Sequence, residues 1–148
     1  MPRVRALLEF STMAKGAKRL AARLAKIPLQ VRAAAATEAL LAAQRLGQLI
    51  AAAAPVDEGD LRASVRVEGG ARGDRFYVKA GGPTTTKPVR KGQSATYDAA
   101  NAVEFGTQKM KAREFFYPTY RANKKHIRAG LEHEIRKAVA KFNGQGSE

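Results

Sequence analysis

The sequence predicts a small α+β domain, in which long helices near both ends of the chain pack on a small antiparallel sheet. Three observations support this class. An alanine-rich segment without an internal proline runs from Leu29 to Ala54, between Pro28 and Pro55. A second helical pattern covers residues 116–142. Between the two, short alternating segments are joined by a Gly-rich turn. Helical and strand periodicities that are separated in this way along one chain are typical of α+β domains.

The N-terminal third is expected to be helical after one short strand. Residues 3–9 alternate as a strand would, and Ser11 or Thr12 can cap a helix that runs to about Lys26. Pro28 suits the first position of the next helix. In that long helix we expect a buried stripe at Val31, Leu41 or Ala42, Leu46, Leu49 and Ala53.

The centre of the chain predicts a hairpin followed by a long loop. Residues 57–60 form a turn with a helix-cap signal, leading into a short run at 61–64. The hairpin arms are Ser64–Glu68 and Arg75–Ala80, which alternate apolar and polar residues. Residues 81–96 are a polar loop, and a loop of this length is usually functional or disordered. We expect it to be mobile, and residues 97–105 fit a short helix or a strand equally well.

The C-terminal helix is expected from about Phe116 to Phe142. Its apolar residues recur at helical spacing, at Tyr120, Ile127, Leu131, Ile135, Ala138 and Phe142. Residues 142–148 form a Gly-rich, flexible tail. The 148 residues fit a single domain over 1–148.

The sequence shows no pattern of catalytic or metal-binding residues. Cysteine is absent, and no glycine cluster is followed by the Lys-Ser/Thr of a phosphate loop. His126 and His133 lie seven positions apart, whereas a helical metal pair needs a spacing near four. We therefore expect no catalytic residue, no cofactor, no metal and no enzyme activity.

The charge predicts an anionic partner. Lys and Arg number 27 against 13 Asp and Glu, a formal net charge of +14, which favours nucleic acid, an acidic protein surface or a membrane. No apolar run approaches the roughly 20 residues of a membrane span, so we expect no membrane partner. The candidate contacts to DNA or to a neighbouring subunit are loop cations, because flexible cations can follow phosphates without reading bases. They are Lys87, Arg90, Lys91, Lys109 and Lys111. A merely solvated basic surface is the alternative.

Two segments together resemble a known family. The first is the segment from Ala54 to Val65, APVDEGDLRASV. The second is VEFGT at 103–107, followed by KAREFFYP at 111–118. These two motif islands resemble the HK97 gp10-like family of phage head–tail joining and tail-completion proteins, over about residues 15–142. Two positions depart from the family pattern: Glu114 stands where the family usually has Pro, and Glu58 replaces a common Thr.

The resemblance carries over to individual positions of this chain. The matching residues are Pro55, Gly59, Leu61, Ser64, Glu104, Phe105, Gly106, Thr107, Arg113, Phe115 and Pro118. We expect residues 104–107 to form a structural turn, with Gly106 at a backbone angle costly to other residues. Glu104 is expected to pair with Lys109, Lys111 or Arg113, and Phe105 and Phe115 to pack into the core.

The resemblance implies a structural virion protein at the neck or tail end of a tailed phage, assembled in the cytoplasm of the host bacterium. Its partners would be further copies of itself in a ring, with a hexamer favoured, together with other neck, connector and tail proteins. DNA would pass through the ring without sequence-specific contacts. The alternative is a free basic protein that binds nucleic acid without sequence preference.

Overall fold

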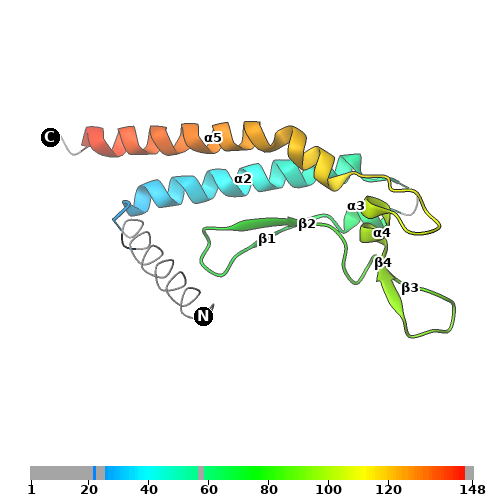
Figure 1. The fold of residues 1–148 in the computed structure, drawn as a ribbon. Coiled ribbons are helices and arrows are strands. Elements are labelled where there is room, and N and C mark those ends of the chain that lie inside the picture. The colour runs from blue at the N-terminus through cyan, green and yellow to red at the C-terminus, as the bar shows by residue number, and fades with distance from the viewer. Residues whose placement is uncertain (1–21, 23–25, 57–58, 146–148) are drawn as a thin grey trace, which may run out of the picture.

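The computed structural model describes residues 22, 26–56 and 59–145, and Figure 1 shows its elements. The elements are α2 (Leu29–Ala53), α3 (Asp60–Ala63), β1 (Arg66–Gly69), β2 (Phe76–Lys79), β3 (Thr86–Pro88), β4 (Thr96–Asp98), α4 (Ala99–Phe105) and α5 (Phe116–Gln145). The predicted α+β class is confirmed, with two two-stranded sheets in place of one. The strand expected at 3–9 and most of the helix expected up to Lys26 lie outside the described residues.

The two long helices lie side by side and run in opposite directions, with the β1–β2 hairpin on the other side of α2 (Figure 1). α2 is therefore the middle layer, in contact with α5 and with both strands of the hairpin. Its small residues let the sheet come close: a Cβ added at Gly47 would lie 3.4 Å from Val67 on β1. The alanine-rich composition of α2 thus fits a helix that is packed on two sides.

The core lies where the C-terminal end of α2 meets α3, α4 and the start of α5. Its buried members are Leu46, Ile50, Ala54, Leu61, Ala100 and Phe115. Ile50 has no exposed surface, whereas Leu49 is 46% exposed. The prediction that Leu49 and Ala53 are buried was therefore wrong. Apolar residues, mostly alanine, occupy more than half of the positions of this helix, so periodicity alone does not select the buried face.

The first hairpin forms as predicted, but burial alternates only along β2, since Glu68 on β1 is half-buried like its neighbour Val67. β1 pairs antiparallel with β2, with Val67 opposite Val78 and Glu68 opposite Tyr77. Both valines are half-buried, while Tyr77 is exposed. Both strands are shorter than predicted: β1 begins two residues later, at Arg66, and β2 begins at Phe76 and ends at Lys79.

The segment predicted as one long loop contains a strand. β3 pairs antiparallel with β4, with Lys87 opposite Tyr97, and the resulting hairpin projects away from the helices (Figure 1). The Thr-Lys-Pro sequence of β3 lacks the apolar alternation that marks a strand, and this explains why it was not predicted. Residues 97–105, which fitted helix or strand, contain both, because the strand ends at Asp98 and α4 begins at Ala99.

α5 is longer and less buried than predicted. It continues beyond Phe142 to Gln145, into the segment expected to be a flexible tail. Along its predicted apolar stripe, Tyr120, Ile135 and Phe142 are 37–41% exposed. Within the described part of the chain, no helix is long and apolar enough to cross a membrane.

The burial difference between neighbouring positions of α2 predicts unequal effects of truncation. Ile50→Ala should lower the free energy of unfolding by about 2–5 kcal/mol, because it leaves a cavity in the core. Leu49→Ala should change it by no more than about 0.5 kcal/mol, as is usual for surface positions. Urea denaturation of the two variants tests this, and equal losses would contradict the position of the core.

Candidate functional site: the junction of the two motif islands

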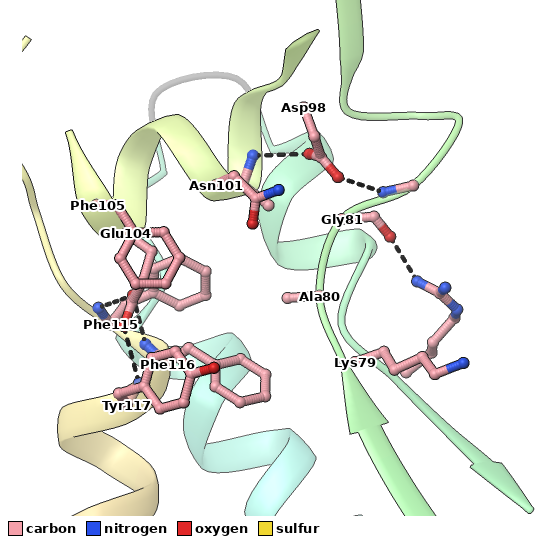
Figure 2. Close-up of a pocket in the computed structure, with 13 residues that line it drawn as sticks. Lys79, Ala80, Gly81, Asp98, Asn101, Glu104, Phe105, Phe115, Phe116 and Tyr117 are labelled. Atoms are coloured by element: carbon pink, nitrogen blue, oxygen red, sulfur yellow. Dashed lines mark hydrogen bonds between the residues drawn. The ribbon is translucent and has the colours of Figure 1, made fainter. Parts of the chain in front are cut away.

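The first motif island is tied to the start of the β3–β4 region. Ser64 is buried, and its Oγ donates to the Leu61 carbonyl at 2.7 Å and accepts the Gly81 N–H at 2.9 Å. The Arg66 guanidinium donates to the Gly81 carbonyl (Figure 2). The backbone of Gly81 is therefore held on both sides, so the segment after β2 leaves the first hairpin in a fixed direction.

Asp98 joins that segment to α4. Its carboxylate accepts the Ala100 N–H at 2.9 Å as the N-cap of α4. It also accepts the Thr85 hydroxyl at 2.7 Å. The Gly82 N–H donates to the same carboxylate at 3.1 Å (Figure 2). A Cβ at Gly81 would lie only 2.4 Å from Asp98 Oδ2, so the close approach requires glycine there.

Glu104 in α4 caps the beginning of α5. Its side chain is buried, with 4% of the residue exposed. Oε2 accepts the N–H groups of Phe115 at 2.8 Å and Phe116 at 2.9 Å, and Oε1 accepts that of Tyr117 at 2.9 Å (Figure 2). The first N–H groups of a helix lack partners within the helix, and an anion there is favoured by the helix dipole.

The environment of Glu104 favours its ionised form. Burial raises the pKa of the carboxyl, but the three backbone N–H groups, with the nearby charge of Arg121, lower it by more. The net pKa lies below its ordinary value of 4.5. The sequence predicted an ion pair with a loop cation, whereas the hydrogen bonds that the structure describes at Glu104 come from backbone N–H groups.

Gly106 turns the chain directly after Glu104 and Phe105. Its φ is +76°, and its N–H donates to the Ala102 carbonyl. A Cβ at this position would lie 2.9 Å from both Ala112 N and Met110 O, which are backbone atoms. The turn is thus strained and crowded for any residue with a side chain.

The loop that follows folds back onto α4. Thr107 and Met110 exchange backbone hydrogen bonds of 2.8 and 3.3 Å, and Thr107 Oγ1 accepts the Met110 N–H at 3.1 Å. The Arg113 N–H then donates to the Val103 carbonyl at 2.8 Å. These bonds bring Phe115 and the next two N–H groups to the Glu104 carboxylate.

The remaining motif residues have different environments. Leu61 and Phe115 are buried in the core, and Pro55 is half-buried just after α2. Gly59 precedes α3 with φ +75°, and Pro118 lies exposed in the first turn of α5. Phe105 was predicted to pack into the core but is 66% exposed, with its ring centroid 6.0 Å from that of Tyr117.

One structural residue of the first island was not singled out from the sequence. Arg62 donates from Nε to the Ala51 carbonyl at 3.0 Å and from Nη2 to the Ala52 carbonyl at 3.4 Å. A cation on the last carbonyls of a helix satisfies them and interacts well with the dipole. Arg62 therefore caps the C-terminal end of α2, and the only local signal for it was a basic residue shortly after Pro55.

The candidate cations lie on two neighbouring loops. Arg90 and Lys91 are exposed beyond β3, and Lys109 and Lys111 are exposed in the loop after Gly106. Lys87 is half-buried on β3 and lines a groove of about 190 Å³ with Tyr97 and Met110. Of the five candidate cations, only Lys87 lines this groove.

The two carboxylates of the junction, Asp98 and Glu104, are occupied by hydrogen bonds within the chain. Each of the four carboxylate oxygens of Asp98 and Glu104 accepts at least one hydrogen bond, most of them from backbone N–H groups. Among the described residues, no three His, Asp or Glu side chains come together as a metal site would require. The arrangement fixes helices and turns relative to one another.

The fold and the junction define a small α+β domain whose turns and helix ends are fixed by buried polar groups. The family model described as "Bacteriophage HK97-gp10, putative tail-component" matches residues 18–106, more than half of the chain. The chain therefore belongs to this HK97-gp10-like family of bacteriophage tail components. The matched residues include the whole first island, 54–65. They end at Gly106, so residues 111–118 of the second island lie outside the match. No curated protein and no solved structure gives a significant match.

The crowding at Gly106 predicts a larger penalty there than at another glycine with the same sign of φ. Gly106→Ala should lower the free energy of unfolding by about 1–3 kcal/mol from backbone strain, and further because its Cβ meets backbone atoms. Gly73→Ala is the matched control, because its φ is +68° and nothing lies within 4 Å of an added Cβ. Thermal unfolding measures both, and equal losses would mean that the crowding around Gly106 contributes nothing.

The capping role of Glu104 predicts a pH-dependent loss of stability. Glu104→Gln should destabilise the protein at neutral pH by about 1.5–3 kcal/mol, the usual contribution of a hydrogen bond to a charged group. A pKa that is lowered in the folded state gives stability that is complete above the unfolded value of 4.5 and is lost as the pH falls through the folded pKa.

The difference between wild type and Glu104→Gln should therefore shrink as the pH is lowered below about 4.5. Glu114→Gln is the control, since that side chain is 55% exposed and lies 3.5 Å from Arg121 in a surface ion pair. Urea denaturation at several pH values is the measurement. A difference that stays constant down to acidic pH would argue against an ionised cap.

Proposed function

We propose that this chain is a non-enzymatic structural subunit that joins the head of a tailed phage to its tail, within a ring around the DNA channel. Membership of a family of phage tail components supports a place in the virion. The neck position, the ring and assembly in the host cytoplasm belong to the proposal. The junction supports it in one respect: its buried polar groups hold elements together, as a rigid subunit of an assembly requires.

The observation that carries the proposal is an aromatic groove that the single chain leaves open. It lies between α2, β2 and the first turns of α5 and has a volume of about 490 Å³. Tyr77 and Tyr117 on its wall are each 47% exposed, and Tyr120 is 37% exposed. Exposed apolar surfaces of this kind mark interaction sites, and tyrosines are enriched in protein interfaces. In the proposed ring this groove receives a neighbouring copy of the chain.

The junction gives this groove a fixed shape. Glu104 sets the start of α5, which carries Tyr117 and Tyr120, while Ser64 and Arg66 set the end of the first hairpin, which carries Tyr77. Interfaces bind better when their surfaces are ordered before association, because less conformational entropy is lost. Ser64 and Glu104 are buried and act on the groove through the elements they hold.

The basic loops have a separate part in the proposal. Lys87, Arg90 and Lys91 on the projecting hairpin, with Lys109 and Lys111 beside them, contact DNA in the channel or an acidic neighbour. Phosphate contacts by such side chains do not depend on sequence and weaken with salt. Weak contacts of this kind suit a channel through which the genome must move.

A charge placed in the groove should prevent assembly without unfolding the subunit. Tyr120→Asp should reduce the oligomer to monomer at concentrations where the wild type forms rings, because a carboxylate would be buried without a partner. Light scattering after size-exclusion chromatography is the measurement, with circular dichroism to establish folding. Val56→Asp is the control, because Val56 is 64% exposed and lines neither groove.

The same variants connect assembly with function in the phage. Phage that encode Tyr120→Asp should yield heads and tails that are not joined in electron micrographs, whereas Val56→Asp should yield joined particles. A monomeric wild type would contradict the ring. Joined particles in phage that lack the chain altogether would contradict head–tail joining, whatever the oligomeric state.

A further inference from the structure

The C-terminal helix α5 carries an excess of positive charge. This helix carries seven Lys or Arg against two Glu, whereas α2, which is nearly as long, carries two Arg and one Glu. The two helices lie side by side with α5 as the outer layer (Figure 1). A helix that only needed to be soluble would mix the two signs of charge on its exposed face. α5 departs from that pattern.

The exposed face of α5 follows from its burial pattern. The half-buried positions after the first turn are Thr119, Asn123, Ile127, Gly130, Leu131, Glu134 and Ala138. At about 100° per residue, the opposite side of the helix carries a line of residues three or four positions apart. These are Arg121, Lys125, Arg128, Glu132 and Arg136, and all of them are exposed. We call the four cations of this line the α5 basic stripe.

The basic stripe is accessible despite its ion pairs. Glu132 lies 3.0 Å from Arg128 and 3.9 Å from Arg136, and Arg121 pairs with Glu114 at 3.5 Å. The three Arg side chains are nevertheless 67–82% exposed. Exposed pairs of this kind contribute only about 0–1 kcal/mol. A polyanion can therefore replace the glutamates as the partner of these guanidinium groups.

We infer that the α5 basic stripe binds the sugar–phosphate backbone of double-stranded DNA without reading its sequence. Its ends, Arg121 and Arg136, are 15 residues apart, which is roughly 22 Å along a helix and about two thirds of a DNA turn. Arginine forms paired hydrogen bonds with phosphate oxygens. The line contains no aromatic side chain on which unstacked bases could pack, so duplex suits it better than single strands.

This inference deepens the proposed function, because it assigns the DNA-facing surface of the subunit to a helix in place of the loops. The two basic regions lie apart, since the β3–β4 hairpin projects on the far side of α2 from α5 (Figure 1). They can therefore be tested separately. The ring assay with Tyr120→Asp does not involve DNA, so the two ideas can fail independently.

The test compares two variants of the full chain in which the same amount of charge is removed. The stripe variant changes Arg121, Lys125, Arg128 and Arg136 to Gln. The loop variant changes Arg90, Lys91, Lys109 and Lys111 to Gln. Fluorescence anisotropy with a labelled duplex measures binding as salt is raised from about 50 to about 200 mM, because the slope of log K against log salt falls by about 0.9 for each phosphate that the protein no longer neutralises.

The stripe variant should lose several units of that slope and bind at least about tenfold more weakly than the loop variant at equal salt. Equal losses in both variants would show that only net charge matters and would overturn the inference. Wild-type binding by the stripe variant, or tighter binding to single strands or polyglutamate than to duplex, would also overturn it. If the fourfold variant does not fold, Lys125→Gln and Arg128→Gln provide the same test singly, each with a slope reduced by about 0.9.

Discussion

The structure depends on one buried carboxylate that begins a helix in another part of the chain. Glu104 lies in α4, yet it accepts the N–H groups of Phe115, Phe116 and Tyr117 at the start of α5. Without it, three donors would be left unsatisfied next to the core, where a missing hydrogen bond costs about 1–3 kcal/mol for each group. The position of that carboxylate determines where α5 starts, and so where the helix lies on α2. Although the chain has a net charge of +14, the described hydrogen bonds of this acid are to backbone N–H groups, so it acts as a helix cap.

The two motif islands are connected by a continuous series of hydrogen bonds. Ser64 in the first island holds Gly81, whose neighbour Gly82 donates to Asp98. Asp98 begins α4, and seven residues later α4 ends just after Glu104, which begins α5. Each step places the next element. The islands are about forty residues apart in sequence. Both fix the geometry of one small junction, which explains why turn and cap residues recur in them.

The sequence predicted those parts of the fold that local patterns determine. α2 was predictable because no proline lies between Pro28 and Pro55, and the first hairpin because apolar and polar residues alternate in the sequence of its arms. The role of Glu104 was not, since its partners lie eleven to thirteen residues away and form no local capping pattern such as a capping box. The prediction of which α2 residues are buried was wrong at Leu49 for a related reason. Leu49 and Ile50 are both large and apolar, and only contacts from distant elements decide which of them is buried.

α5 shows how the same constraint leads from fold to function. Its first turns are fixed by Glu104 and contribute Phe116 and Ile127 to the packing around the core. Further along, Ile135, Val139 and Phe142 are 37–41% exposed, so tertiary burial stabilises this half less. Helix-favouring Ala, Lys and Arg, with pairs such as Glu132 and Arg136, support it there at a few tenths of a kcal/mol each. The N-terminal half of α5 is thus fixed by packing and capping, whereas apolar side chains of its C-terminal half remain exposed to solvent. We therefore expect the C-terminal half of α5 to bury more of its surface against partners in the assembled particle than it buries within the subunit.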